Sequence, residues 1–451
     1  MSGAMSGRSY HVCGVAGVGM NPLAQALALS GAKVSGSDRY LDQGDELDVF
    51  RKLRGVGISL VAQDGSGVTE ETSALVVSTA IEEDNPDWLA AKRLGIPVVH
   101  RARLLAELAG ARRCVAVAGT SGKTTLTGMI GSVLAKIGWD PMVVNGGAVL
   151  EWMDEERIGN VRWGASPWCV VEVDESDRSL LKFYPELAVI NNISRDHFSF
   201  EESVELFQQF ARQCGRVVAL PEAARAMGLD PAFPDVAMHL EQGRWSVRYE
   251  DVTFTLQVPG RHNAENAIAA MATLDAMGCD VEACAEAMGR FRGIHRRLEE
   301  VGEAGGVRVV DDYAHNPAKI RASWQAAAER GGRVLGFWRP HGYGPLAAMR
   351  TDLGEMFRQT LGPDDRLWIL PVYYAGGTAT RSVESSDLVG DLQSTHGSVG
   401  FTGDYGALQD EILAEARVGD TILGMGARDP DLPRFARICL KALASRDVPG
   451  R

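Results

Sequence analysis

Short apolar runs alternate with longer amphipathic stretches along the chain. The apolar runs are typical of buried strands, and helical patterns lie between most of them. The strand-like runs are YHVCGVAG (10–17), ALVVSTA (74–80), CVAVAG (114–119), CVVEV (169–173), LAVINNIS (187–194), VRVVDDYA (307–314), RVLGFW (333–338), RLWILPV (366–372) and DTILGMG (420–426). Regular alternation of strands with helices predicts an α/β fold with largely parallel sheets.

Two breaks divide this pattern into three stretches. Residues 107–113 and 293–306 are glycine-containing connections, and each leads into a new strand-like run. We therefore expect three α/β domains at residues 1–108, 109–294 and 295–451. A different segment, RWSVRYEDVTFTLQV at 244–258, alternates with period two and predicts an antiparallel edge.

Composition narrows the functional classes. The 451 residues include 46 Lys and Arg against 59 Asp and Glu, a formal net charge of −13, which argues against nucleic acid or an anionic membrane as partner. A phosphate ligand is still compatible, because backbone amides can bind an anion locally. Seven scattered cysteines without a C-x-x-C pair indicate reduced thiols. Since no long apolar run occurs, we expect a soluble cytoplasmic protein, monomeric or homodimeric, that acts on small molecules.

A glycine loop follows the first strand-like run and precedes a helical pattern. It contains Gly17 and Gly19, in the place where nucleotide-diphosphate loops occur, although the strict G-x-G-x-x-G spacing is absent. The next strand-like run, KVSGSD, ends at Ser37 and Asp38, where an acidic group can meet a ribose. The loop is either a diphosphate site or a tight turn without a ligand.

The second glycine loop carries the strongest chemical signal in the chain. The run at 114–118 leads into GTSGKTT (119–125), which opens a helical pattern. Backbone amides and a helix N-terminus can hold phosphates, Lys123 can reach the β- and γ-phosphates, and Thr124 can bind Mg²⁺. Val117 stands where the Walker pattern has its first glycine. We predict a nucleotide phosphate site formed by Gly119, Thr120, Ser121, Gly122, Lys123, Thr124 and Thr125.

Polar clusters follow two further strand-like runs. Residues 171–177 include Glu172 and Glu175, and residues 191–197 end in His197. Beside a phosphate loop such residues suit magnesium and phosphate chemistry, whereas alone each cluster fits a solvated turn or a helix cap. Because the phosphate loop is present, we favour the metal site.

Later segments also gather polar residues. Asn263 and Asn266 are three residues apart at the start of an alanine-rich helical pattern and share one face, where a helix cap is the alternative interpretation. DDYAHNP (311–317) and RPHGYGP (339–345) each follow a strand-like run. Their crowding at two strand ends predicts a cleft lined by a third domain.

Taken in order, these motifs make the sequence similar to the Mur ligases, the ATP-dependent amide-forming enzymes of bacterial peptidoglycan precursor synthesis. The resemblance covers roughly residues 8–445 and rests on GVAGVGM, SGSD, VVSTAIEEDNP, AGTSGKTT, VDESD, NISRDH, GRHNAENAIAA and DDYAHNP. The first third resembles most the branch that joins L-alanine to UDP-N-acetylmuramate. The murein-recycling branch, which attaches a peptide to the same nucleotide sugar, is the alternative.

The resemblance implies one role for each domain. An N-terminal Rossmann-like domain would bind UDP-N-acetylmuramate, a central P-loop ATPase-like domain would bind ATP and Mg²⁺, and a C-terminal Rossmann-like domain would bind the acceptor. The implied sugar-nucleotide residues are Gly17, Gly19, Ser37, Asp38, Ser78, Thr79 and Arg101. The implied Mg²⁺ ligands are Thr124, Glu172 and His197, with Glu175 in reserve.

The resemblance also implies the remaining site. The residues near the adenine would be Asn263 and Asn266. Those that face the acceptor would be Tyr313, His315 and His341. The nucleotide site would be completed by Arg297 and Asp312, and the catalytic set would be Lys123, His197, Arg297, Asp312 and His315.

Two departures from the family pattern concern the ATP site. Ser121 replaces the histidine of the common G-T-H-G-K-T loop. We expect little loss of phosphate binding, because backbone amides make most of the contacts in such a loop. No lysine lies between Lys182 and Lys319, so the carbamylated lysine with which several relatives hold a second metal ion is absent.

The third departure concerns the acceptor. The alanine-adding branch usually has a P-H-R-Y-x-R segment in the third domain, and its two arginines are associated with the carboxylate of the amino acid. The matching segment of this chain is PHGYGP (340–345), with Gly342 and Pro345 in place of the arginines. Neither residue can replace a bidentate arginine. Either another arginine, such as Arg339 or Arg350, substitutes for them, or the acceptor is different, for example a peptide.

Other functions remain open at this point. A non-catalytic nucleotide-binding protein could retain the fold, although Lys123, Glu172, His197 and Asp312 together favour an enzyme. A folate-polyglutamate-type ligase shares the G-T-x-G-K-T loop but leaves the first domain unexplained. A dehydrogenase leaves the second loop unexplained.

Overall fold

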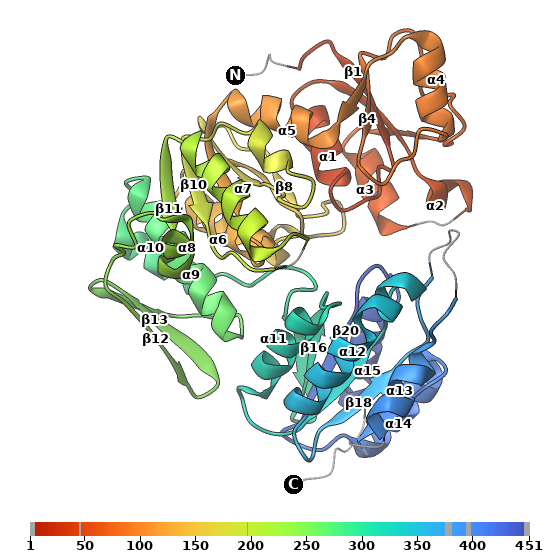
Figure 1. The fold of residues 1–451 in the computed structure, drawn as a ribbon, viewed down its shortest axis with the longest axis vertical. Helices are drawn as coiled ribbons and strands as arrows, with labels where there is room; N and C mark the ends of the chain where they lie inside the picture. Colours follow the sequence, from red (N-terminus) through yellow and green to blue (C-terminus); the bar gives the residue numbers. More distant parts are fainter. Residues whose placement is uncertain (1–4, 45–46, 196, 375–380, 394–397, 446–451) are drawn as a thin grey trace. The chain divides into compact units, whose positions relative to one another are not determined.

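The computed structural model describes residues 5–44, 47–195, 197–374, 381–393 and 398–445 (Figure 1). Strands and helices alternate along most of these residues, as the sequence pattern predicts. Unit 1 comprises Met1–Ala237, Arg248–Phe254 and Glu265–Arg292, and unit 2 comprises Met238–Val247, Thr255–Ala264 and Gly293–Arg451. The three domain ranges expected from the sequence stay a prediction.

The first sheet of unit 1 is parallel throughout, with the order β3-β2-β1-β4-β5. Its strands are β1 (Ser9–Cys13), β2 (Lys33–Ser37), β3 (Ser59–Val61), β4 (Ala74–Val77) and β5 (Val98–His100). Its helices are α1 (Asn21–Leu29), α2 (Arg39–Asp42), α3 (Asp48–Gly55), α4 (Pro86–Leu94) and α5 (Arg101–Gly110). Asn85 caps α4 and Pro86 occupies its first turn, where no intrahelical partner awaits its missing N–H.

The second sheet of unit 1 has the order β11-β10-β6-β9-β7-β8, and only β8 runs antiparallel to its neighbour. The strands are β6 (Arg113–Ala118), β7 (Met142–Val144), β8 (Val161–Arg162), β9 (Trp168–Glu172), β10 (Leu187–Ile190) and β11 (Arg216–Ala219). The helices are α6 (Lys123–Lys136), α7 (Phe200–Arg212), α8 (Pro221–Met227), α9 (Arg261–Ala276) and α10 (Val281–Met288), with short 3₁₀ turns at Leu150–Trp152 and Ser179–Lys182.

The segment with period-two alternation forms a small sheet of its own. Strands β12 (Val236–Glu241), β13 (Arg244–Tyr249) and β14 (Val252–Thr255) have the order β12-β13-β14. The segment is therefore stranded as predicted, but it is not the edge of a larger sheet.

The sheet of unit 2 has the order β15-β16-β20-β17-β18-β19. It is parallel except for β15, which pairs antiparallel with β16. The strands are β15 (Glu299–Ala304), β16 (Val307–Asp312), β17 (Val334–Trp338), β18 (Arg366–Ile369), β19 (Val399–Phe401) and β20 (Thr421–Met425). The helices are α11 (Pro317–Ala328), α12 (Tyr343–Thr360), α13 (Ser385–Gln393), α14 (Tyr405–Glu415) and α15 (Leu432–Ala444).

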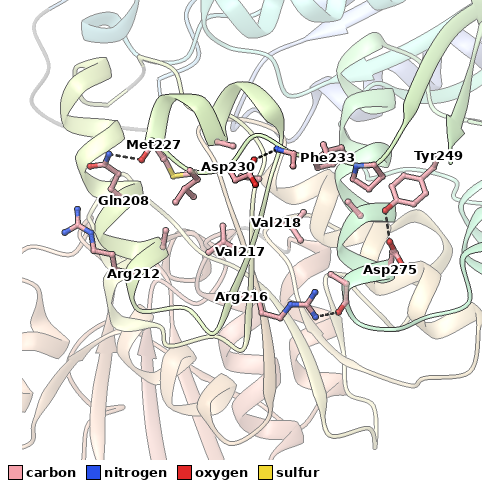
Figure 2. A pocket seen from close by; sticks show the side chains of 18 residues that line it. Gln208, Arg212, Arg216, Val217, Val218, Met227, Asp230, Phe233, Tyr249 and Asp275 are labelled. Carbon is pink, nitrogen blue, oxygen red and sulfur yellow. Dashed lines mark hydrogen bonds between the residues drawn. The ribbon is translucent and has the colours of Figure 1, made fainter.

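A cavity of about 710 Å³ lies beside the edge strand β11 in unit 1. Figure 2 shows Val217 and Val218 on its floor, with Met227 and Phe233 among the apolar side chains around it. None of the site residues predicted from the sequence lines this cavity.

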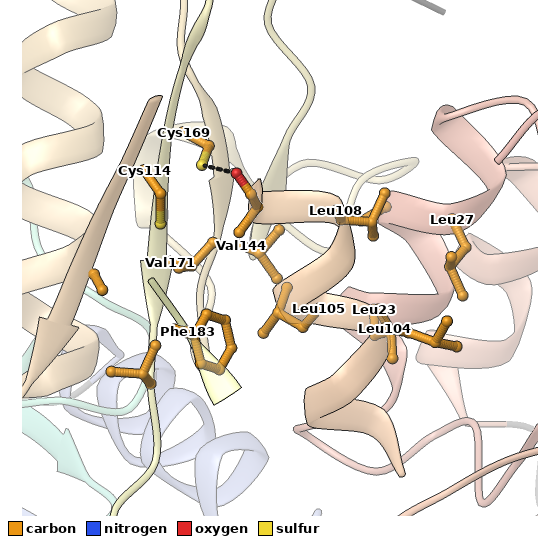
Figure 3. Packing of buried hydrophobic residues seen from close by; sticks show 14 of the residues in the cluster. Leu23, Leu27, Leu104, Leu105, Leu108, Cys114, Val144, Cys169, Val171 and Phe183 are labelled. Atoms are coloured by element: carbon orange, nitrogen blue, oxygen red, sulfur yellow. Dashed lines mark hydrogen bonds between the residues drawn. The ribbon is translucent and has the colours of Figure 1, made fainter. Parts of the chain in front are cut away.

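The two large sheets of unit 1 share one apolar core. Figure 3 shows leucines of α5, including Leu105 and Leu108, between the leucines of α1 and the strands of the second sheet. Val171 of β9 and Phe183 belong to the same cluster. Because α5 is buried on both sides, the first two sheets fold as one compact unit.

We expect Phe183→Ala to lower the free energy of unfolding of unit 1 by about 3–5 kcal/mol, the usual range for deleting a buried ring. Phe183 is 3% exposed, whereas its neighbour Tyr184 is 76% exposed, so Tyr184→Ala is a matched control that should change it by less than about 0.5 kcal/mol. Urea unfolding followed by circular dichroism measures both. Equal midpoints for the two variants would contradict the shared core.

Candidate functional site

Three loops meet at one edge of the second sheet. Strand β6 lies between β9 and β10, with Val117 beside Glu172 and Ala118 beside Ile190 in the two registers. Because parallel strands end at the same edge, the loops that follow these three strands lie side by side there. The sequence-predicted phosphate loop and both acidic clusters belong to these loops.

The phosphate loop has a backbone that only glycine adopts without strain at two positions. Gly119 has φ +137° and Gly122 has φ +82°. A Cβ at Gly122 would lie 2.6 Å from Asn266 Oδ1 and 2.8 Å from Asn191 Nδ2, and the Asn191 amide itself donates to Asn266 Oδ1 at 2.6 Å. The two asparagines therefore pack directly against the loop, so Asn266 belongs to this site.

Asn192 fixes the loop from the side of β10. Its carbonyl accepts the Thr120 N–H at 3.0 Å, and its side-chain Oδ1 accepts the Ser121 N–H at 2.9 Å. Thr125 is buried in the first turn of α6. Asn263, in contrast, donates to the Pro259 carbonyl at 2.7 Å.

Lys123 forms a buried ion pair at the start of α6. Its Nζ donates to the Gly119 carbonyl at 2.8 Å and to the Glu175 carboxylate. Burial raises the pKa of Glu175, and the charge of Lys123 opposes this shift. Glu175, which the sequence placed in reserve as a metal ligand, is thus the partner of the loop lysine.

Glu172 and Thr124 form the second polar pair of the loop. Thr124 Oγ1 donates to Glu172 Oε1 at 3.2 Å, and the Gly146 N–H donates to Glu172 Oε2 at 2.9 Å. Such a carboxylate and hydroxyl fit Mg²⁺, which takes few protein oxygens and keeps water and phosphate ligands. Among the described residues, no group of three or more acidic, histidine or cysteine side chains is placed to hold a metal ion.

The third expected Mg²⁺ ligand, His197, is exposed. No hydrogen bond or ion pair of its ring occurs within the part of the chain that the structure describes. Its neighbour Asp196, part of the same sequence motif, lies outside the described residues. A metal role of His197 stays a prediction.

Arg101 connects the first glycine loop with the loop that follows β9. Its Nη2 lies 3.2 Å from Asp174 Oδ2, in the loop after β9, and a Cβ at Gly19 would lie 3.2 Å from its Cζ. Burial opposes ionisation of Asp174, but Lys123, Ser176 and Arg101 together lower its pKa. Asp174 is 73 residues away from Arg101 along the chain, so no local sequence pattern predicts the contact.

A row of buried asparagines makes a second connection, from the first glycine loop to Glu172 at the end of β9. Asn21 Nδ2 donates to the Gly17 carbonyl at 3.0 Å, and Asn160 Nδ2 donates to Asn21 Oδ1 at 2.6 Å. The Asn160 carbonyl accepts the Asn145 N–H at 2.9 Å, and the next residue holds Glu172. All three asparagines are buried, so the row is protected from competing water.

The first glycine loop is shaped from within. Asp38 is buried, and its Oδ2 accepts the Ala16 N–H at 2.9 Å while its Oδ1 caps α2. Ser37 is completely buried and donates to Asp87, so its hydroxyl lies in the interior rather than on the loop surface. Ser78 is partly buried and Thr79 is exposed after β4.

A second cluster lies in unit 2, at the carboxyl end of β16. The Asp312 carboxylate accepts the Leu298 N–H at 2.6 Å, the Ala314 N–H at 2.7 Å and the Ser323 hydroxyl at 2.9 Å. Leu298 has φ +47°, so Asp312 holds a strained turn. This turn places the Arg297 guanidinium 5.2 Å from the centre of the Tyr313 ring.

Three aromatic side chains follow one another beside this turn. The rings of Tyr313 and His315 are 5.7 Å apart, and those of His315 and His341 are 5.2 Å apart, each pair edge to face. Burial, with the nearby charge of Lys319, lowers the pKa of His315 to about 4. His315 is therefore neutral at physiological pH and able to accept a proton.

Both arginines expected to compensate for Gly342 and Pro345 already have carboxylate partners. Arg339 Nη1 lies 2.7 Å from Asp429 Oδ2, and Arg350 Nε lies 2.6 Å from Asp391 Oδ2. The structure therefore does not support either substitute.

Comparison with known proteins agrees with this arrangement. Models of the Mur ligase family match the chain in three parts: the catalytic domain at residues 9–113, the middle domain at 117–213 and the glutamate ligase domain at 296–428. The UDP-N-acetylmuramate–L-alanine ligases of Synechococcus sp. and Gloeobacter violaceus are 35% and 36% identical to it. These matches cover 98% and 94% of this chain, and 94% of each relative. The chain belongs to the Mur ligase family.

Solved structures of Mur ligases extend the comparison. The UDP-N-acetylmuramate–alanine ligase of Thermotoga maritima superimposes with a TM-score of 0.80 at 25% identity, over 97% of this chain and 99% of the other. A murein peptide ligase of Psychrobacter arcticus gives a TM-score of 0.64 at 19% identity, over 98% and 99%. The described part of this Mur ligase has no helix long and apolar enough to cross a membrane.

We expect the His315 ring of this Mur ligase to titrate near pH 4, and Lys319→Met to raise that midpoint because one nearby cation is removed. Protonation is disfavoured in the folded state, so the contribution of His315 to stability is full above about pH 6.5 and is lost as the pH falls towards 4. Nuclear magnetic resonance titration of the ring measures the midpoint. A midpoint near 6.5 in the unmodified protein would refute the buried neutral histidine.

Proposed function

We propose that this Mur ligase is an ADP-forming enzyme that joins L-alanine to UDP-N-acetylmuramate in the cytoplasm. The observation that carries the proposal is the phosphate loop with Lys123, Thr124 and Glu172 at one sheet edge, in a chain similar over nearly its whole length to ligases of that name. The geometry suits transfer of a phosphoryl group, and the similarity to ligases of that name supports these substrates.

The reaction proceeds in two displacements. A carboxylate oxygen of the sugar's lactyl group attacks the γ-phosphorus of ATP; an O–P bond forms, the bond to ADP breaks, and an acyl phosphate results. The neutral amine of alanine then attacks the acyl carbon, the C–O bond to phosphate breaks, and the amine loses a proton. Lys123 would neutralise charge on the transferring phosphoryl group.

Mg²⁺ would be held by Glu172 and Thr124, whose oxygens lie together beside the loop. When bound, the ion supplies charge neutralisation for the nucleotide phosphates. Glu172 is oriented for this task by the Gly146 N–H. His197 is a further ligand implied by the family resemblance.

The acceptor amine would meet the residues of unit 2. His315 is neutral at physiological pH, and since its Nδ1 lies 3.0 Å from the Tyr313 carbonyl, its Nε2 would take the proton that the amine releases. Tyr313 and His341 flank it and would shape the space for the acceptor. Arg297 lies 5.2 Å from the centre of the Tyr313 ring, beside the turn that Asp312 fixes, and a nucleotide-binding role for both residues is implied by the family resemblance.

The sugar nucleotide would bind along the first glycine loop. Gly17 and Gly19 would leave room for the diphosphate, with Ser78 and Thr79 at the neighbouring strand end. Arg101, already beside Gly19, offers a cation to the same group. Asp38 would fix the conformation of this loop by accepting the Ala16 N–H, without itself contacting the diphosphate.

One observation keeps a peptide acceptor as the second candidate. Gly342, the N-cap of α12, and Pro345, in its first turn, stand where the usual carboxylate arginines would be, and these smaller residues would leave space for a larger group. Phosphate release from ATP and Mg²⁺ with UDP-N-acetylmuramate, tested with L-alanine, glycine, L-serine and the murein tripeptide, separates the two. We expect release with L-alanine; release with the tripeptide alone would select the recycling reaction.

We expect Lys123→Ala to reduce kcat/KM by roughly 10²–10³-fold, because a preorganised charge on the transferring group is lost. Lys136→Ala is the matched control: Lys136 is an ion-paired lysine on the same helix, but at its other end, beside Glu151. It should remain within about threefold of the unmodified enzyme. Nucleotide binding without turnover in the unmodified protein, with every acceptor, would favour a non-catalytic role.

A further inference from the structure

The three parallel strands at the centre of the unit 2 sheet end in matched register. Strand β20 lies between β16 and β17, and Met425 stands opposite Asp312 on one side and Trp338 on the other. Three residues beyond these partners come Arg428, His315 and His341. Because parallel strands end at one edge, Arg428 follows the strand between those that carry the two histidines.

Arg428 is exposed and has φ +64°, a left-handed conformation that favours glycine. A long charged side chain therefore stands where glycine would adopt the backbone conformation with less strain. Among the described residues, no ion pair or hydrogen bond of its guanidinium occurs. Burial lowers the pKa of the neighbouring His341, and the charge of Arg428 lowers it further, which agrees with the cation being close to that ring.

The neighbouring cations are already engaged. Asp429, the next residue, is buried against Arg339 and the Tyr405 hydroxyl rather than Arg428. Arg381 lies 5.4 Å from the ring centres of both Tyr343 and Tyr374. Arg428 is therefore the arginine of this edge with neither a carboxylate nor a ring partner in the described part of the chain.

We propose that Arg428 binds the α-carboxylate of the acceptor and so determines the specificity of the reaction for a free amino acid. A carboxylate entering beside two neutral histidines needs a cation with paired N–H donors, which a guanidinium supplies. The amine of the same molecule then lies towards His315. This assignment rests on the ligase function proposed above.

The test compares L-alanine with L-alaninamide, which keeps the amine and lacks the charge. In Arg428→Gly we expect the KM for L-alanine to rise roughly 10- to 100-fold, kcat to change less than about threefold, and the KM for L-alaninamide to stay unchanged. Glycine suits φ +64°, so this variant should fold with an unchanged or higher Tm. Arg428→Lys should recover part of the affinity.

Two further variants make the result specific. Arg434→Met removes an exposed arginine of α15 that pairs with Asp431 and should leave every constant unchanged. Arg381→Met tests the rival cation. An unchanged preference for L-alanine over L-alaninamide in Arg428→Gly, or loss of that preference in Arg381→Met instead, would overturn the assignment alone. Inactivity of the unmodified protein with every acceptor would overturn the proposed function and the assignment together.

Discussion

The largely desolvated ammonium of Lys123, whose side chain is 13% exposed, is the constraint on which the ATP site depends. A charge removed from water needs a partner of opposite sign, and Lys123 finds it in Glu175, a residue of the loop after β9. The pair therefore fixes the phosphate loop against the neighbouring strand end. Asp174, adjacent to Glu175, in turn holds Arg101, so the same constraint extends to α5 and the first glycine loop.

The second connection, between Gly17 and Glu172, consists of buried neutral asparagines instead of ion pairs. Neutral amides in series satisfy each other's donors and acceptors without the desolvation cost of charges, and they run from Gly17 to the residue that orients Glu172. Only the Asn145 Nδ2 atom in this row is buried without a partner. The first glycine loop is therefore tied to Glu172 through this polar row, and to Asp174 through the Arg101 contact.

The sequence predicts the strands that are buried on both faces and the loops whose chemistry is local. The runs that form β6, β9 and β20 are continuously apolar because helices cover both faces of a parallel sheet, and the glycine-lysine-threonine loop needs no distant residue to be recognised. Strand β8 has only two residues, and β15 is polar because it is an edge, so neither leaves a pattern. No sequence pattern predicts the partners of Arg101 and Ser37 either, because Asp174 and Asp87 are brought close to them only by the tertiary fold.

At the carboxyl edge of the unit 2 sheet, backbone conformation limits which positions can carry an arginine. Gly342, the N-cap of α12, has φ +81° and ψ +137°, a combination that L-residues avoid. An arginine at this position would therefore strain the turn that leads into the helix. Position 428 also has a positive φ, but with φ +64° it lies in the left-handed helical region that a non-glycine residue can occupy at modest cost. Arg428, after β20, can therefore supply a cation at the sheet edge where the backbone of Gly342, after β17, disfavours an arginine. The positive charge then lies beside His315 and His341.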